Sequence, residues 1–290
     1  MIMQKNRFLK QYKAEIDVFI SSALKEDIGS GDHTGQSCLS NLQSSKANLI
    51  VKESGIIAGV ELAEYIFKSK NASFKFESKI KDGSRVKARD VVFTIEGPQL
   101  ELLATERLVL NCMQRMSGIA TLTHQTAALI QHTKCKLLDT RKTTPNFRYP
   151  EKWAVLIGGG ENHRMGLFDM IMIKDNHIDF CGSVTAALTK TKKYLESQNL
   201  EIPVIIEVRN NEEIEACLDF QWIHRILLDN MNPEKLSEGL KIIKGRIATE
   251  ASGNITTQTI VSIAETGVDY VSLGAITHSA KNIDLSLKAV

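Results

Sequence analysis

The sequence predicts an α/β fold in which a parallel sheet closes, or nearly closes, into a barrel. From residue 136 onward, short apolar runs alternate with helical segments, and each run ends in charged or glycine residues. Such alternation is typical of βα units, whose strands lie parallel. The first third of the chain has a different pattern, so we expect a separate N-terminal part.

The N-terminal part is expected to contain a helix, a turn-rich stretch and short strands. Helical spacing covers residues 16–24, turn residues fill 26–34, and strand-like runs lie at 47–51, 56–60 and 91–96. A long, mostly apolar helical stretch follows at 100–131, with an interruption expected near Ser117 and Gly118. We interpret Arg115 within it as a salt-bridged or snorkelling side chain.

Six apolar runs are predicted as strands of the sheet, at 136–139, 170–173, 204–208, 225–228, 246–250 and 270–273. Helices are expected between the later runs, at 183–198, 212–218, 233–243 and 256–265. A complete barrel of this class has eight strands. Either the barrel is incomplete or a strand lacks a clear signal.

Composition narrows the class of protein. The 36 Lys and Arg nearly balance the 34 Asp and Glu over 290 residues, which argues against nucleic acid or an anionic membrane as the main partner. The five cysteines are widely spaced and suggest neither a disulfide framework nor a zinc site. Charges recur through the first residues, which resemble neither a signal peptide nor a membrane span. We expect a cytoplasmic enzyme.

Cationic residues gather in the stretch 138–177, which is the most informative part of the chain. They follow apolar runs, and the carboxyl ends of parallel strands are where ligands bind. So many cations near one sheet edge predict a site for an anion. The residues concerned are Arg141, Lys142, His163, Arg164 and Lys174, beside the acids Asp139 and Asp175.

The later strand ends carry acids and glycines. Glu207 and Asp229 end strongly apolar runs. They are either salt-bridged carboxylates or ligands for magnesium and sugar hydroxyls, which also stabilise positive charge on a sugar. Ser252–Gly253 and Gly274–Ala275 end two successive strands near helix starts, which predicts a phosphate site. The triplet Gly158–Gly160 either approaches a phosphate or marks only a turn.

These motifs resemble the quinolinate phosphoribosyltransferases, also called carboxylating nicotinate-nucleotide pyrophosphorylases. The resemblance runs nearly from end to end, and Asp139–Pro145 followed by the later cationic motifs is highly specific. The stretches that carry it are Glu26–Thr34, Ala104–Arg107, Asp139–Pro145, Asn162–Arg164, Ile173–His177, Glu250–Ile255 and Ser272–Ala275.

The resemblance implies an incomplete α/β barrel of about seven strands and an N-terminal α/β sandwich domain. We expect the sandwich at 1–112, joined by the tail 277–290, and the barrel at 113–276. It also implies a homodimer whose sites combine the barrel of one chain with the N-terminal domain of the other.

The implied activity transfers phosphoribosyl from phosphoribosyl pyrophosphate (PRPP) to quinolinate with decarboxylation. The products are nicotinate mononucleotide, pyrophosphate and CO2, in de novo NAD biosynthesis, with Mg²⁺ as cofactor. By matching motifs, quinolinate is surrounded by Arg107, Arg141, His163, Arg164 and Lys174, with Arg107 reaching the partner's site. PRPP and magnesium are held by Lys142, Glu207, Asp229, Ser252, Gly253, Gly274 and Ala275, with Glu207 and Asp229 as metal ligands. The expected catalytic residues are Lys142, Lys174, Glu207 and Asp229.

Three positions depart from the family pattern. Asn146 stands where glycine is usual, Trp153 where tyrosine is common, and Arg209 where a second acid is often found. Three other functions stay open. One is a related phosphoribosyltransferase associated with molybdenum transport, another a Schiff-base aldolase using Lys174, and the third a non-catalytic phosphate-binding protein.

Overall fold

The computed structural model describes residues 7–39 and 43–290, which divide into two compact units. Unit 1 contains residues up to 124 together with 142–160 and 276–290, and unit 2 contains 125–141 and 161–275. The expected boundary at 112 therefore differs from this division, which assigns 113–124 and 142–160 to unit 1. An ion pair between Arg115 and Glu151 joins these two segments within unit 1.

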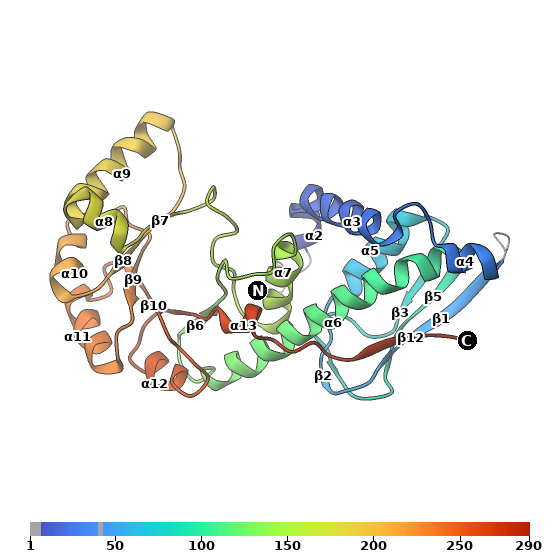
Figure 1. The fold of residues 1–290 in the computed structure, drawn as a ribbon. Helices are drawn as coiled ribbons and strands as arrows, with labels where there is room; N and C mark the ends of the chain where they lie inside the picture. Colours follow the sequence, from blue (N-terminus) through green and yellow to red (C-terminus); the bar gives the residue numbers. More distant parts are fainter. Residues whose placement is uncertain (1–6, 40–42) are drawn as a thin grey trace. The chain divides into compact units, whose positions relative to one another are not determined.

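Unit 1 is built on an antiparallel sheet. Its four strands lie in the order β12-β1-β5-β3, and β12 from the C-terminal tail pairs along β1 (Figure 1). A second, two-stranded sheet pairs β2 with β4. The strands are β1 (Ser44–Val51), β2 (Gly55–Ile56), β3 (Lys75–Ser78), β4 (Arg85–Val86), β5 (Val91–Pro98) and β12 (Leu285–Ala289).

The strand expected at 56–60 is largely absent, since a helix begins at Val60. The carboxylate of Asp82 accepts hydrogen bonds from the backbone N–H groups of Val60 and Glu61 at 2.9 and 3.1 Å. These are N–H groups that the first turn of a helix leaves without partners. The helices outside unit 2 are α2 (Phe8–Gln11), α3 (Lys13–Ile28), α4 (His33–Cys38), α5 (Val60–Lys70), α6 (Gln99–Leu129), α7 (Arg148–Gly158) and α13 (Ala275–His278), of which α6 and α13 extend across a unit boundary.

Helix α6 continues through Ser117 and Gly118, so the expected interruption there is wrong. A glycine inside a helix costs about 1 kcal/mol relative to alanine, but Gly118 allows the backbone of Lys281 to approach where a Cβ atom would collide with it. Ser117 Oγ also bonds the backbone of Ala58, accepting from its N–H at 3.0 Å. Tertiary contacts therefore stabilise the helix at this point.

Arg115 on α6 ties three segments of unit 1 together. Its Nε lies 2.9 Å from Oε1 of the fully buried Glu151, and Nη1 donates to the carbonyl of Ala280 at 2.7 Å. Nη2 donates to the carbonyl of Thr277. The interpretation of Arg115 as a salt-bridged residue is confirmed.

Unit 2 contains a parallel six-stranded sheet in the order β6-β11-β10-β9-β8-β7 (Figure 1). All six predicted strands are present. The two outer strands of the sheet, β6 and β7, do not pair with each other, so the barrel is incomplete. A single parallel bridge between Leu138 and Glu161 adds a short seventh segment beside β6. The strands are β6 (Lys136–Leu138), β7 (Ile171–Ile173), β8 (Val204–Val208), β9 (Arg225–Asp229), β10 (Ala248–Ser252) and β11 (Tyr270–Ser272).

Three helices of unit 2 begin at side-chain caps that the sequence carries. Ser183, Asn210 and Asn232 each accept a backbone N–H three residues later. β8 is buried along its whole length, as a strand covered on both faces should be. The helices are α8 (Asp175–Cys181), α9 (Val184–Gln198), α10 (Asn211–Cys217), α11 (Pro233–Ile243) and α12 (Ile260–Ala264). Within residues 7–39 and 43–290, none of the helices combines the length and hydropathy needed to span a membrane.

Candidate active site

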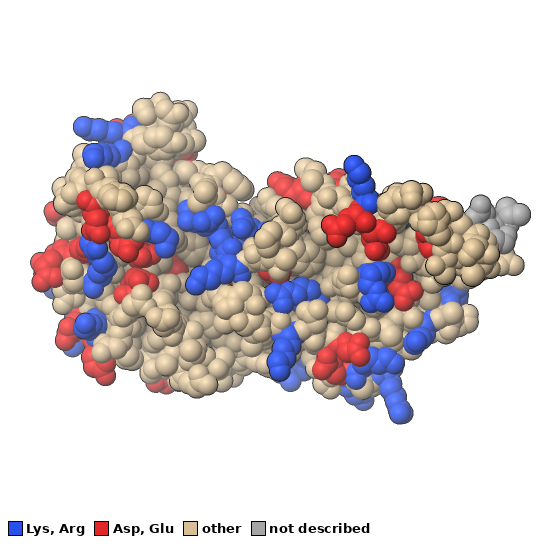
Figure 2. Space-filling view, in the orientation of Figure 1, with Lys and Arg blue, Asp and Glu red and all other residues tan. Residues whose placement is uncertain are grey.

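The parallel register brings the predicted strand-end residues of unit 2 to one edge of the sheet. Ile173 pairs with Ile206, so Lys174 and Glu207 follow neighbouring positions, and Asp229 pairs directly with Ser252. Ser272 pairs with Leu138, which precedes Asp139. Figure 2 shows Lys and Arg side chains gathered on the visible face where Figure 1 draws the chain just before β7. The residues placed along this edge are Asp139, Arg141, Lys174, Glu207, Asp229, Ser252, Gly253, Gly274 and Ala275.

His163 is held by the buried carboxylate of Asp139. Asp139 Oδ1 accepts the backbone N–H of His163 at 2.8 Å, and Oδ2 accepts Asn162 Nδ2 at 2.6 Å. The imidazole Nδ1 in turn accepts the backbone N–H of Arg164 at 2.7 Å. These contacts fix the backbone of residues 162–164 and orient the imidazole ring.

A second buried carboxylate, Glu250, faces the other nitrogen of His163. Glu250 Oε2 lies 3.4 Å from His163 Nε2 and 2.6 Å from Arg225 Nη1, and the Arg225 guanidinium lies 3.8 Å from the ring centre of Tyr270. Burial alone would raise the pKa of Glu250, but the bond to His163 and the charge of Arg225 outweigh it and lower the pKa. The sequence patterns predict no role for Glu250 or Arg225, although a charge inside an apolar strand run is a usable signal.

Arg164 lies in a partly desolvated position close to another cation. Its Nη1 donates to the carbonyl of Met170 at 3.1 Å, and Nη2 lies 3.8 Å from the sulfur of Met172. Burial, followed by the charge of Arg141, lowers the pKa of Arg164, and Asp169 opposes this in part. Two guanidinium groups that repel each other here would be stabilised by a bound anion.

Lys174 and Glu207 form an ion pair between the ends of β7 and β8. Lys174 Nζ lies 3.1 Å from Glu207 Oε2, with the lysine side chain 48% exposed and the glutamate 10%. Burial raises the pKa of Glu207, Lys174 opposes the rise, and the negative charges of Asp229 and Asp175 add to it. The salt-bridged alternative for Glu207 therefore describes its state in this structure.

Hydrogen bonds of Asn230 connect the ends of β9 and β10. Its N–H donates to the carbonyl of Ser252 at 2.9 Å, and its Oδ1 accepts Asn254 Nδ2 at 3.0 Å. Gly253 has φ +90°, and a Cβ atom there would collide with Asn230. Only glycine fits this turn, which places Ser252 and Gly253 beside Asp229.

Two predicted site residues lie in unit 1, and the glycine triplet has another role. Arg107 is exposed on α6, and the carbonyl of Lys142 accepts Thr277 Oγ1 at 2.8 Å. The N–H groups of Gly159 and Gly160 donate to Leu156 and Val155 at 3.2 and 3.0 Å. The triplet therefore ends α7, and these two amides are used within the chain rather than turned toward a phosphate.

Family models match almost the whole chain in two adjoining parts. Residues 32–117 match the N-terminal domain of quinolinate phosphoribosyl transferase, and 119–288 match its C-terminal domain. The chain belongs to the quinolinate phosphoribosyltransferase family.

Relatives and solved structures of the family agree over most of their length. The mitochondrial decarboxylating quinolinate phosphoribosyltransferase 2b of Nicotiana tabacum is 46% identical over 281 residues, which cover 92% of this chain and 80% of the relative. NadC from Streptococcus pyogenes superposes with a TM-score of 0.88 at 38% identity, over 95% and 97% of the two chains. The nicotinate-nucleotide pyrophosphorylase of Francisella tularensis gives 0.83 at 38% identity, over 96% of each.

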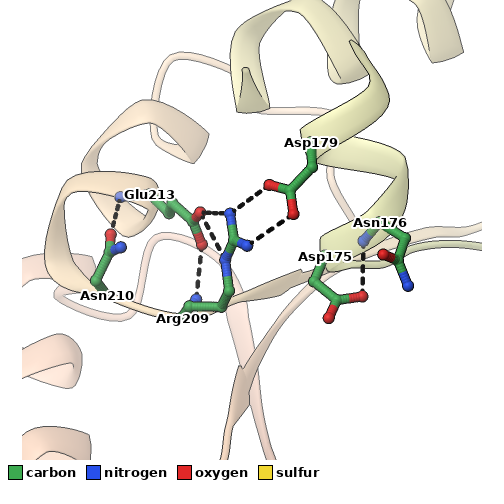
Figure 3. A network of polar contacts seen from close by, with 6 residues as sticks. All are labelled: Asp175, Asn176, Asp179, Arg209, Asn210 and Glu213. Atoms are coloured by element: carbon green, nitrogen blue, oxygen red, sulfur yellow. Dashed lines mark hydrogen bonds and ion pairs between the residues drawn. The ribbon is translucent and has the colours of Figure 1, made fainter. Parts of the chain in front are cut away.

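The structure accounts for the three departures from the family pattern. Asn146 has φ +62°, a conformation that glycine adopts easily and asparagine tolerates better than most residues. Trp153 is buried and stacks on Phe8 with ring centres 5.4 Å apart. Arg209 forms ion pairs with Asp179 and Glu213 (Figure 3).

Proposed function

We propose that the carboxyl edge of the unit 2 sheet is the place where this chain transfers phosphoribosyl from PRPP to quinolinate with decarboxylation. The products are nicotinate mononucleotide, pyrophosphate and CO2, and the reaction belongs to de novo NAD biosynthesis. The observation that carries the assignment to this edge is the position of the buried Arg164, which lies close enough to Arg141 for that second positive charge to lower its pKa. Such a pair of cations suits a planar substrate with two carboxylates.

Quinolinate brings adjacent carboxylates, which guanidinium groups bind through two parallel hydrogen bonds. In our proposal Arg141, Arg164 and Lys174 bind them, and His163 belongs to the same site. The contacts of Asp139 and Glu250 with His163 hold this segment rigid before the substrate arrives. Preorganised contacts of this kind cost little at the moment of binding.

PRPP is assigned to the other half of the edge. Its phosphate suits Ser252–Gly253 and Gly274–Ala275, at the ends of the neighbouring strands β10 and β11. Glu207 and Asp229 end the neighbouring strands β8 and β9, where their carboxylates suit the ribose hydroxyls. Both substrates then meet where Lys174 and Glu207 form their ion pair.

Bond formation starts with the pyridine nitrogen of quinolinate attacking C1′ of the ribose as the C1′–pyrophosphate bond breaks. Positive charge develops on the sugar, and Glu207 and Asp229 stabilise it electrostatically. The bond between C2 of the ring and its carboxylate then breaks and releases CO2. The electron pair left on C2 is stabilised by the adjacent ring nitrogen, now positively charged, and a proton from solvent completes the product.

Magnesium is proposed as the cofactor, held by Glu207 and Asp229 together with PRPP. Their charges act on each other across β8 and β9, and within the described residues no three His, Cys, Asp or Glu side chains form a group that could hold a metal. Mg²⁺ is commonly bound by one or two carboxylates plus substrate phosphates, so this pair fits it. When bound, the ion neutralises charge on the leaving pyrophosphate. Removal of the metal with EDTA should abolish turnover, and added Mg²⁺ should restore it.

A homodimer with shared sites is proposed from the position of Arg107. It lies exposed on α6 one turn after Leu103, an apolar side chain that is 46% exposed, and this face suits a partner chain. Mixing inactive Arg107→Ala with inactive Lys174→Ala should recover about a quarter of full activity. Random pairing makes about half the dimers mixed, each with one intact site. No recovery in verified mixed dimers would exclude sharing.

A cytoplasmic location is also proposed. The five cysteines are all free, which suits a reducing compartment. Fractionation of the native cells, followed by detection of the chain in each fraction, tests this. Recovery in a membrane or organelle fraction would contradict it.

The assay that tests the function supplies quinolinate, PRPP and magnesium, and follows nicotinate mononucleotide, pyrophosphate and CO2 together. Equal release of all three is expected. Turnover only with nicotinate or another base would keep the phosphoribosyl site and discard quinolinate as the acceptor. A borohydride-trapped adduct at Lys174 with carbonyl substrates would instead support the aldolase.

A further inference from the structure

Arg209 lies at the centre of an ion-pair network two residues after Glu207 (Figure 3). Its Nη1 and Nη2 donate to the two carboxylate oxygens of Asp179 on α8 at 3.1 and 2.9 Å. Its Nε and Nη2 donate to Glu213 on α10 at 3.0 and 2.6 Å, and its backbone N–H donates there at 2.7 Å. One guanidinium therefore links the end of β8 to two helices.

The same two βα connections are already joined once, by the ion pair of Lys174 with Glu207 at 3.1 Å. Lys174 is the N-cap of α8, and Asp179 lies within that helix. The chain after β7 and the chain after β8 are thus held together by two bridges. The first bridge contains two residues that the proposed reaction assigns to substrates, and the second does not.

Helix α8 buries little of its own surface. It is seven residues long, and Ile178 is its only buried residue, while Phe180 next to Asp179 is 88% exposed. Short helices with few buried contacts open locally at low free-energy cost. When quinolinate binds Lys174 and the ribose binds Glu207, the first bridge is lost, and α8 then depends on Asp179.

We propose that Arg209 is a positioning residue that keeps α8, and with it Lys174, in place while the substrates separate Lys174 from Glu207. This rests on the function proposed above. An isolated exposed ion pair is worth little, but a bidentate arginine within a network is the exception. Glu213, whose side chain is 13% exposed, anchors the guanidinium on the side away from α8. A lysine cannot form the parallel pair of bonds to Asp179 together with the two bonds that converge on Glu213 Oε1.

The test compares Arg209→Met, Arg209→Lys and Asp179→Asn with the wild-type chain. The readouts are kcat, KM for quinolinate, and hydrogen exchange of residues 174–181 with and without substrates. We expect Arg209→Met to raise KM about threefold to tenfold, with a smaller change in kcat, and to speed exchange in α8 most when both substrates are bound. Asp179→Asn should act in the same direction.

Arg209→Lys separates positioning from charge, because lysine keeps the positive charge but cannot form the bidentate hydrogen bonds of a guanidinium group. It should leave most of the defect in place. The matched control is Lys192→Met, which removes an exposed ion pair with Glu196 on α9 and should change neither readout.

A wild-type KM and wild-type exchange in Arg209→Met would overturn the proposal. So would full rescue by Arg209→Lys, or a raised KM without faster exchange in α8, because either would mean that Arg209 acts on the substrates through its charge. A wild-type chain that does not turn over quinolinate would refute the proposed function instead. The exchange of α8 without substrates would still show whether Arg209 holds the helix.

Discussion

The two sides of the sheet edge in unit 2 are held in different ways. On the side of β6, β9 and β10, buried groups fix the site, with Asp139 and Glu250 fully buried and Arg225 nearly so. On the side of β7 and β8, the pairs of Lys174 with Glu207 and of Arg209 with Asp179 are at least partly exposed.

The difference matches what each side must do. Charges buried with their partners cannot exchange those partners without a large cost, so the backbone of residues 162–164 stays fixed. Exposed pairs are weak and exchange readily with water, ions or ligands. In the site that we propose, the buried side therefore preorganises the residues that bind the anion, and the exposed side releases Lys174 and Glu207 to substrates.

The largest effect is expected where a buried pair is broken. Glu250→Ala leaves the charge of Arg225 buried without its carboxylate, so the free energy of unfolding should fall by about 3–5 kcal/mol. Urea unfolding measures this. The double variant Glu250→Leu with Arg225→Met removes both charges and should regain much of the stability, but not the activity that depends on His163. A loss below about 1 kcal/mol in the single variant would remove the distinction between the two sides.

The next effect concerns the cations that bind the proposed dicarboxylate. Arg141→Ala and Arg164→Ala should each lower kcat/KM for quinolinate by about 2–3 kcal/mol of transition-state stabilisation, because a charged hydrogen-bond donor is lost. The conservative variants Arg141→Lys and Arg164→Lys keep the charge. They should recover only part of the lost kcat/KM, since lysine cannot form bidentate hydrogen bonds with a carboxylate. Unchanged kcat/KM in both alanine variants would show that the substrate does not bind between these arginines.

A smaller effect is expected at a half-buried carboxylate among other acids. Burial, with Asp82 and Glu64 nearby, raises the pKa of Glu61 in unit 1 to about 7. The unfolded chain ionises near the ordinary value of 4.5, so stability is present below that pH and is lost as pH rises through about 7. The loss should be about 1–2 kcal/mol, allowing for solvent screening.

Urea unfolding of wild type and Glu61→Gln between pH 5 and 8 measures the effect at Glu61. Relative to Glu61→Gln, the free energy of unfolding of the wild type should fall as pH rises through about 7. Glu64→Gln, which removes one neighbouring negative charge, should reduce this fall. A constant difference at every pH would show that Glu61 ionises normally in the folded chain.

The smallest expected effect is a difference between the two sides in how hydrogen exchange responds to ionic strength. Raising NaCl from about 0.05 to 0.5 M shortens the Debye length from above 10 Å to below 5 Å. Hydrogen exchange in α8 should become faster, by a factor that corresponds to less than about 1 kcal/mol. Exchange at His163 and Arg164 should not change, because their backbone N–H groups bond buried partners. Equal responses in both segments would contradict the comparison.

Much of the fold follows from local patterns in the sequence. Apolar runs predict all six parallel strands, and three of the predicted helices have a side-chain cap nearby in the sequence, at Ser183, Asn210 and Asn232. The polar residues after these runs share one sheet edge because parallel strands point the same way. Only the order of the strands was needed to bring Lys174 beside Glu207 and Asp229 beside Ser252.

Partners far apart in the chain could not be predicted in this way. The continuity of α6 at Gly118 depends on Lys281, and the orientation of His163 on Glu250. Arg209 and Asp179, 30 residues apart, meet only because β7 and β8 are neighbours. The sequence by itself determined the strands, the helix starts and the chemical character of the sheet edge, because periodicity and capping are local. The tertiary structure alone decided which charges are buried together and which stay exchangeable, since that depends on packing between distant segments.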